Sequence, residues 1–177
     1  MAKLTDIDKK AEEKGSLLKT VWQFFKFIIV SLLAMIVQFV LLNTLQLIPA
    51  IKELYSTDFS WWVFVYPVAI GGLGYFIVSN VANIVAQIVA FFVNKEKTFN
   101  SGANIAVALP VYIVFTIALI VFSAWLNPTL KELFVDYNLS EDVAKNIATM
   151  ICSAVQFFLY FPVDKILFKK PKEEKAE

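Results

Sequence analysis

The sequence has no histidine and no arginine, and it has one cysteine. The absence of histidine removes the side chain that most often transfers protons near neutral pH and the commonest metal ligand. Without arginine, no guanidinium can bind a carboxylate or phosphate through two parallel hydrogen bonds. Cys152 alone forms neither an intramolecular disulfide nor a thiolate metal site, and we interpret it as a small buried packing residue. We therefore expect no metal site and no cofactor.

The sequence also lacks the residue combinations of an enzyme active site. It has no paired carboxylates within a predicted span, no glycine-rich phosphate loop after a strand, and no serine–lysine pair at a suitable spacing. Asp164 and Lys165 are interpreted as an ion pair at the membrane interface rather than as a catalytic pair. We predict that the protein is not an enzyme. A formal net charge of +1 argues against a nucleic-acid partner.

What the sequence does contain is long apolar runs. Of its 177 residues, 59% are hydrophobic, and the mean hydropathy is +0.67. About 20 apolar residues suffice to cross the hydrocarbon core of a bilayer. The sequence therefore predicts an all-α polytopic membrane protein with four transmembrane helices, at about residues 24–45, 75–94, 105–126 and 144–161. A tail at 1–21, a membrane domain at 22–168 and a charged tail at 169–177 complete the predicted organisation.

Three segments between or before the predicted spans are harder to assign. Residues 59–74 are apolar but contain one proline and three glycines, and they are interpreted as interfacial, re-entrant or part of the second span, with Trp61 and Trp62 in the aromatic belt. Residues 127–142 are predicted to be a loop on the outer side. The N-terminal segment is either a short amphipathic helix on the membrane surface or a solvated tail.

The lysines are unevenly distributed along the chain. Thirteen of the 16 lie in residues 1–26, 95–104 and 165–177, and the remaining three lie in the other two loops. Cytoplasmic loops of membrane proteins carry an excess of positive charge. The distribution therefore predicts a multi-pass protein of the cell membrane with both termini in the cytoplasm.

The predicted second span carries two different faces. Three amides share one helical face at spacings of i, i+3 and i+7: Asn80, Asn83 and Gln87. Three alanines at i, i+4 and i+8 form a seam of small residues that lets another helix approach closely: Ala82, Ala86 and Ala90. The span ends at Asn94, Lys95 and Lys97. Its inner end is therefore predicted to be polar and cationic.

An internal repeat relates the second and fourth predicted spans. Aligning residue 80 with residue 146 gives five identities in 14 positions, among them Asn80 with Asn146 and Phe91 with Phe157. With three extra residues in the second copy, Phe99 lies opposite Phe168 and Lys95 opposite Asp164. Each copy would hold two spans, which predicts two parallel two-helix repeats. Asn146 and Gln156 would then belong to a second polar stripe facing the first.

The four-span plan resembles the GtrA-like family over residues 22–168. That family has an asparagine early in the second span, then an aromatic residue and an ending Asn-Arg-x-x-Thr/Val-Phe, which Asn80, Phe91-Phe92 and Asn94–Phe99 resemble. Lys95 stands where arginine is usual, and the fourth-span copy lacks the asparagine–basic pair. The resemblance implies translocation of a polyprenyl-phosphate-linked sugar for glycosylation of cell-wall polymers or surface polysaccharide.

The residues and the resemblance together predict a flippase for this lipid-linked sugar. The cations and amide expected to bind the lipid phosphate are Lys26, Asn94, Lys95, Lys97 and Lys165. The amides expected to line the path of the sugar are Asn80, Asn83, Gln87, Asn146 and Gln156. The expected partners are the lipid-linked sugar, membrane lipids and a glycosyltransferase.

Two other functions remain as alternatives. The protein could be a non-transporting membrane anchor or partner of a glycosyltransferase, for which the lysines and the alanine seam would suffice. A small-molecule exporter is disfavoured, because such a pump needs an intramembrane carboxylate and the sequence places no acid in the middle of a span. The oligomeric state is open. Because four spans enclose little space, a homo-oligomer is among the arrangements that the sequence allows.

Overall fold

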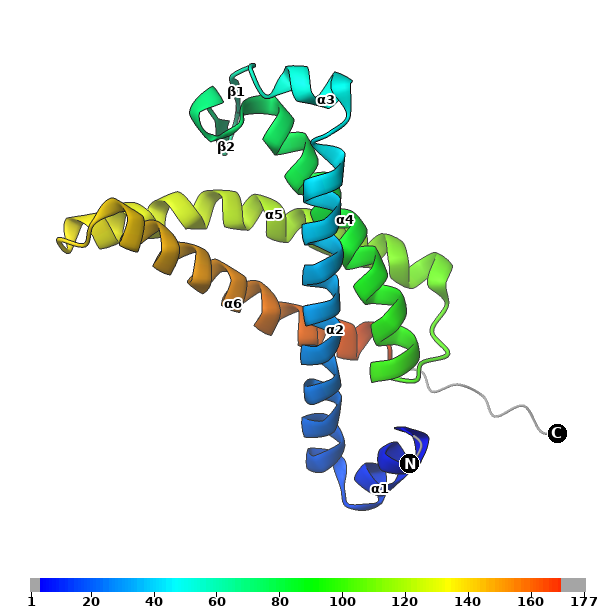
Figure 1. Cartoon of the computed structure of the whole chain (residues 1–177). Helices are drawn as coiled ribbons and strands as arrows, with labels where there is room; N and C mark the ends of the chain where they lie inside the picture. Colours follow the sequence, from blue (N-terminus) through cyan, green and yellow to red (C-terminus); the bar gives the residue numbers. More distant parts are fainter. Residues whose placement is uncertain (1–3, 170–177) are drawn as a thin grey trace.

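The computed structural model describes residues 4–169, without the side chains of residues 4–6, 12, 141, 142, 145, 146 and 149 (Figure 1). Its α-helices are α1 (Leu4–Glu13), α2 (Ser16–Leu45), α3 (Pro49–Leu54), α4 (Gly72–Val93), α5 (Ile105–Asp136) and α6 (Glu141–Leu167). Strands β1 (Phe59–Trp61) and β2 (Phe64–Tyr66) and a 3₁₀ turn (Val68–Ile70) lie between α3 and α4. A π-helical turn (Asn94–Thr98) continues α4.

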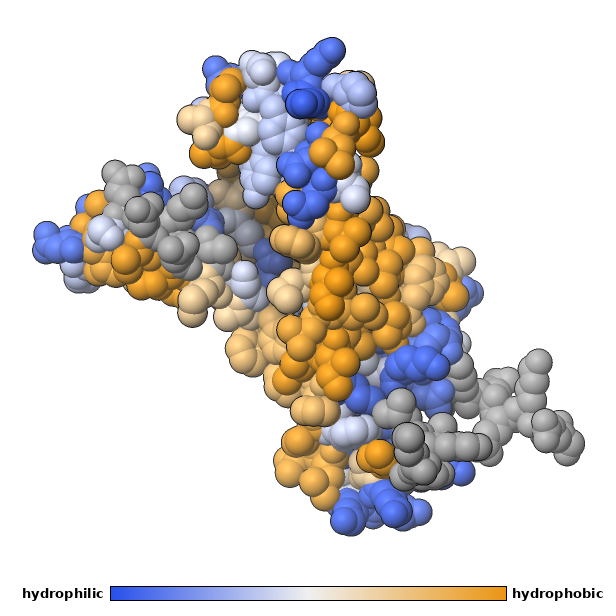
Figure 2. Space-filling view, in the orientation of Figure 1, coloured by the Kyte–Doolittle hydropathy of each residue, from blue (hydrophilic) through white to orange (hydrophobic). Residues whose placement is uncertain are grey.

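Four helical segments in the described part of the chain are long and apolar enough to cross a membrane: Ser16–Leu45, Gly72–Thr98, Ile105–Asp136 and Met150–Leu167. Many of their large apolar side chains are exposed, including Phe39 of α2 and Val114 of α5. Figure 2 shows hydrophobic residues over the middle of the visible face and hydrophilic residues toward its ends. A surface of this kind is unfavourable in water and suited to lipid. The predicted helical class with four apolar helices is confirmed.

The long helices pack as two pairs, α2 with α4 and α5 with α6. The pairs cross one another in Figure 1. The alanine seam lies in the first pair, where Ala86 and Ala90 of α4 pack against Val30 and Ala34 of α2. Because these side chains are small, the two backbones can approach closely.

Aromatic rings join the two pairs near the end of α4 and the end of α6. The ring of Phe91 lies 5.1 Å from that of Phe168, and the ring of Phe99 lies 6.2 Å from that of Phe161, measured between centroids. Tyr112 of α5 packs in the same buried cluster. Each pair therefore contributes rings to the other at this junction.

The last two long helices extend further than the sequence predicted. Residues 127–136 belong to α5 rather than to an outer loop, although Pro128 lies within them. This segment holds good helix formers, such as Leu130 and Glu132, which favour continuation of the helix. In α6, the helix passes Pro162 and ends at Leu167 instead of stopping at residue 161. A proline removes one backbone hydrogen bond, which packing against neighbouring helices can offset.

Residues 59–71 form a cap over the start of α4, and the two strands of this cap were not predicted from the sequence. Phe59 pairs with Tyr66 and Trp61 with Phe64 in an antiparallel hairpin. Three of its rings surround Phe76 of α4, at centroid distances of 4.4, 5.2 and 5.3 Å. The hairpin is therefore held by packing on the helix, because strands this short are not stable alone. Only the residues from Gly72 onward belong to the second long helix.

The lysine-rich segments of the described chain meet at one end of the bundle (Figure 1). Lys26 Nζ of α2 donates to the backbone oxygen of Lys97 at 2.8 Å. Lys165 Nζ of α6 donates to Thr20 Oγ1 of α2 at 2.7 Å. The start of α2, the π-helical turn and the end of α6 thus lie side by side.

Candidate functional site

The π-helical turn at the end of α4 directs Asn94 into the protein. The backbone N–H of Phe99 donates to the oxygen of Asn94 at 2.9 Å, which closes a wider ring than an α-helix does. Asn94 is only 1% exposed. Single π-helical turns occur frequently at functional sites, because they change the direction of side chains within an otherwise regular helix.

Asn94 links α4 to Asp164 of α6. Its Nδ2 donates to Asp164 Oδ2 at 2.7 Å, and its Oδ1 accepts from Thr98 Oγ1 at 2.8 Å. Asp164 is completely buried, and its Oδ1 has no hydrogen-bond partner among the described residues. Burial of a carboxyl group costs free energy unless the group is hydrogen-bonded. The hydrogen bond from Asn94 therefore offsets part of the cost of burying Asp164.

The predicted ion pair between Asp164 and Lys165 is wrong. Lys165 is exposed and its Nζ bonds Thr20 instead. Consecutive residues of an α-helix point about 100° apart, so one side chain can face the core while the next faces outward. Sequence reasoning did not predict that Asp164 is buried, but this acid lies near the end of α6 and not at its middle.

Lys26 is a second buried polar group at this end, with 8% of its surface exposed. Its Nζ donates to Asp8 Oδ1 of α1 at 2.8 Å and to the backbone oxygen of Lys97 at the same distance. Trp22 Nε1 also donates to Asp8 Oδ1. Asp8, which sequence reasoning did not single out, is therefore the counterion of Lys26 and fastens α1 to α2.

The predicted phosphate-binding residues occupy one region but differ in accessibility. We use the name collar for polar residues of the π-helical turn together with the two side chains that bond to the turn. The collar consists of Asn94, Lys95, Lys97, Thr98, Lys26 and Asp164. Lys95 is 6% exposed and its Nζ lies 3.4 Å from Glu96 Oε1, whereas Lys97 is exposed. Lys165 lies beside the collar, at Thr20. The collar therefore contains both buried and accessible cations.

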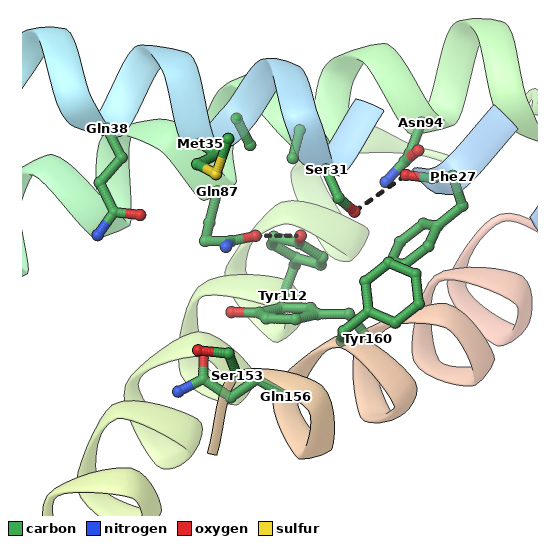
Figure 3. A pocket seen from close by; sticks show the side chains of 13 residues that line it. Phe27, Ser31, Met35, Gln38, Gln87, Asn94, Tyr112, Ser153, Gln156 and Tyr160 are labelled. Atoms are coloured by element: carbon green, nitrogen blue, oxygen red, sulfur yellow. Dashed lines mark hydrogen bonds between the residues drawn. The ribbon is translucent and has the colours of Figure 1, made fainter. Parts of the chain in front are cut away.

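A small cavity of about 150 Å³ begins at the collar and runs between the helices. Figure 3 shows side chains around it from four helices: Gln38 of α2, Gln87 of α4, Tyr112 of α5, and Ser153, Gln156 and Tyr160 of α6. Asn94 also lines it. The Tyr112 hydroxyl donates to Gln87 Oε1 at 3.1 Å, so one wall is itself hydrogen-bonded.

A larger cavity of about 580 Å³ adjoins the first. Its polar lining includes Asn80, Asn83, Ser123 and Asn127, and residues of β2 close one side. Gln38, Ser153 and Gln156 line both cavities, so the two cavities are adjacent. Among the described side chains, no lysine, aspartate or glutamate lines either of these two cavities. Together they extend from Asn94 to Asn80, and their linings combine apolar side chains with uncharged amides and hydroxyls.

The structure brings most of the predicted sugar-path residues to these two cavities. Asn80 and Asn83 line the larger cavity, Gln87 the smaller one, and Gln156 both. The side chain of Asn146 lies outside the described part of the structure. Asn80 Nδ2 donates to the backbone oxygen of Phe76 at 2.7 Å, within its own helix. Gln156 Nε2 donates to Ser123 Oγ at 2.6 Å and so links α6 to α5.

Sequence reasoning missed the polar contribution of α5. The third predicted span has few polar residues, but Tyr112, Thr116 and Ser123 recur at i, i+4 and i+11, which places them on one face. Tyr112 and Thr116 are buried, and Tyr160 donates to Thr116 Oγ1 at 3.0 Å. This spacing of hydroxyl groups was the sequence signal that could have identified the polar face of α5.

Comparison of the chain with protein-family models, with characterised proteins and with solved structures gives no match.

Proposed function

We propose that the protein moves a polyprenyl-phosphate-linked sugar across the cell membrane, for glycosylation of a cell-wall polymer or surface polysaccharide. The observation that carries this proposal is a pair of adjacent cavities, whose polar lining consists of uncharged amides and hydroxyls, beginning beside the lysines of the collar. A sugar presents hydroxyl groups that both donate and accept hydrogen bonds, and amide side chains do the same. The resemblance to GtrA-like proteins implies the same class of substrate, a polyprenyl-phosphate-linked sugar.

The collar is the proposed position of the lipid phosphate. Lys97 is exposed there, and Lys26 is already bound to one carboxylate oxygen of Asp8. A phosphate oxygen has the charge and hydrogen-bonding capacity to replace that carboxylate at Lys26. The sugar would then enter the small cavity past Asn94 and meet Gln87, Gln156 and Asn80 in turn.

We infer that the collar faces the cytoplasm and that both termini lie on that side, because the lysine-rich segments meet at this end. We also infer that the α2–α4 and α5–α6 pairs are two parallel repeats. The alignment of residue 80 with residue 146, with five identities in 14 positions, supports this relation. Transport would run downhill, driven by synthesis of the lipid-linked sugar inside and its consumption outside.

The substitution Asn80→Leu tests the role of the cavities. We expect it to abolish glycosylation at the outer face while the protein remains in the membrane at normal level. Asn43→Leu is the matched control, because Asn43 Nδ2 also donates to an oxygen of its own helix at 2.7 Å but lines neither cavity. Normal glycosylation with Asn80→Leu, or equal loss with both variants, would contradict the proposal.

The alternative function is that of a non-transporting anchor for a glycosyltransferase. The alanine seam that such an anchor would offer is buried against α2, so it is not available to a partner. Purified protein in vesicles with labelled lipid-linked sugar separates the two functions. Movement of the sugar in the absence of any transferase would exclude a pure anchor, and no movement would favour it.

A further inference from the structure

A groove of about 460 Å³ lies between α1 and the first turns of α2, away from the two cavities. Its lining is Ile7, Lys10, Ala11, Lys14, Leu18, Val21, Trp22 and Phe25. The apolar floor comes mainly from α2, where Val21 is 57% and Phe25 is 53% exposed. Two lysines from the α1 side stand at its rim.

The groove has a fixed shape because α1 is fastened to α2. Asp8 of α1 accepts from Trp22, which lines the groove, and from Lys26, which belongs to the collar. Both bonds end on a half-buried carboxylate, where charge-assisted hydrogen bonds are stronger than neutral ones. The floor belongs to the first turns of α2, which is the first of the helices long and apolar enough to cross a membrane.

We propose that this groove binds an anionic phospholipid of the membrane leaflet on the collar side. One acyl chain would cover Val21 and Phe25, and the headgroup phosphate would lie between Lys10 and Lys14. These lysines are four residues apart and both line the groove, so they present positive charge to one headgroup. An apolar floor beneath a cationic rim complements a molecule with an apolar tail and a negative head. The proposal uses neither the cavities nor sugar transport.

Trp22 provides the measurement, because its ring lines the groove. A variant with Trp61→Phe, Trp62→Phe and Trp125→Phe leaves Trp22 as the single tryptophan. In vesicles, brominated phosphatidylglycerol should quench its fluorescence at lower mole fraction than brominated phosphatidylcholine. Replacing both rim lysines, Lys10→Gln with Lys14→Gln, should reduce this preference by about thirtyfold, which corresponds to about 1 kcal/mol per lysine near a membrane surface.

The matched control is Lys9→Gln with Lys19→Gln, which removes the same charge from the same segment but from residues that do not line the groove. We expect this pair to retain most of the preference for phosphatidylglycerol. An equal loss in both pairs would show diffuse attraction to the membrane and would overturn the proposal. So would the absence of any preference in the single-tryptophan protein. Because sugar transport is not measured, failure here would leave the proposed function standing.

Discussion

The two ends of the pair of cavities use the same amino acid in opposite ways. At the collar, Asn94 is almost fully buried and joins α4 to Asp164 of α6. At the larger cavity, Asn80 is partly exposed and its amide nitrogen donates to the backbone oxygen of Phe76 in its own helix. One asparagine therefore holds two helices together, whereas the other keeps hydrogen-bonding capacity that faces a cavity. Polar residues in an apolar helix thus serve either assembly or binding, and the neighbours decide which.

The difference follows from what each asparagine faces across the protein. Asp164 brings a carboxyl group into a buried position, and that group requires a donor. Beside Asn80, the described side chains that line the cavity are uncharged. No buried carboxyl group there needs a hydrogen bond from the Asn80 amide. Substitutions at the two asparagines should accordingly affect different properties, stability at the collar and transport at the cavity.

The largest effect on stability is expected for Asn94→Leu. The substitution removes the donor to Asp164 Oδ2, and the other carboxyl oxygen already has no partner among the described residues. We expect the free energy of unfolding, measured in mixed detergent–SDS micelles, to fall by about 3 kcal/mol. For Asn80→Leu we expect a change below about 0.6 kcal/mol, the average for a polar contact between membrane helices, because the hydrogen bond of Asn80 lies within its own helix.

A double substitution sharpens this prediction. If the loss arises from an unsatisfied carboxyl group, adding Asp164→Leu to Asn94→Leu should recover most of the stability, because replacing both partners of a buried polar pair is often neutral. Additive losses would instead indicate that shape, and not hydrogen bonding, determines packing at the collar. Equal losses for Asn94→Leu and Asn80→Leu would remove the distinction between the two ends.

How much of this arrangement the sequence predicts depends on whether the information is local. The amide face and the alanine seam of α4 follow from helical periodicity within one segment, and both lie where the spacing places them. The contact of Asn94 with Asp164 joins residues 70 positions apart, and no local pattern indicates it. The repeat alignment set Asp164 opposite Lys95, which is next to Asn94 in the sequence, but it did not identify Asn94 as the partner of Asp164.

The hairpin was missed for a related reason. Its strands have three residues each, and their stability comes from rings that pack on Phe76 rather than from strand propensity. The glycines after it were read as interruptions of an apolar run. In the structure Gly72 has a φ of +53°, and a Cβ there would lie 2.2 Å from the backbone oxygen of Thr57. The glycine is therefore required by close approach between the cap and the start of α4.

Gly72→Ala is expected to produce the next largest effect, at the end opposite the collar. The added methyl group must displace the Thr57 backbone, and the residue keeps a left-handed conformation that costs roughly 1–2 kcal/mol. We expect a total loss of about 3 kcal/mol or less in the unfolding measurement, together with a change in the fluorescence of the hairpin tryptophans. Gly15→Ala is the control, since Gly15 also has positive φ but nothing within 4 Å of an added Cβ. If both variants lose the same stability, close approach at the cap has no consequence.

The smallest effect is expected for Lys165→Gln, and it decides how Asp164 is satisfied. If Lys165 were the counterion of this buried carboxyl group, its removal would destabilise the protein as much as Asn94→Leu. In the structure Lys165 is exposed and bonds the hydroxyl of Thr20, a contact typical of the surface. Surface substitutions usually change stability by less than about 0.5 kcal/mol, and we expect that range in the same unfolding measurement. If the free energy of unfolding fell as much as for Asn94→Leu, Lys165 would be the counterion of Asp164. The amide of Asn94 would then be available to a ligand, as the amide of Asn80 is.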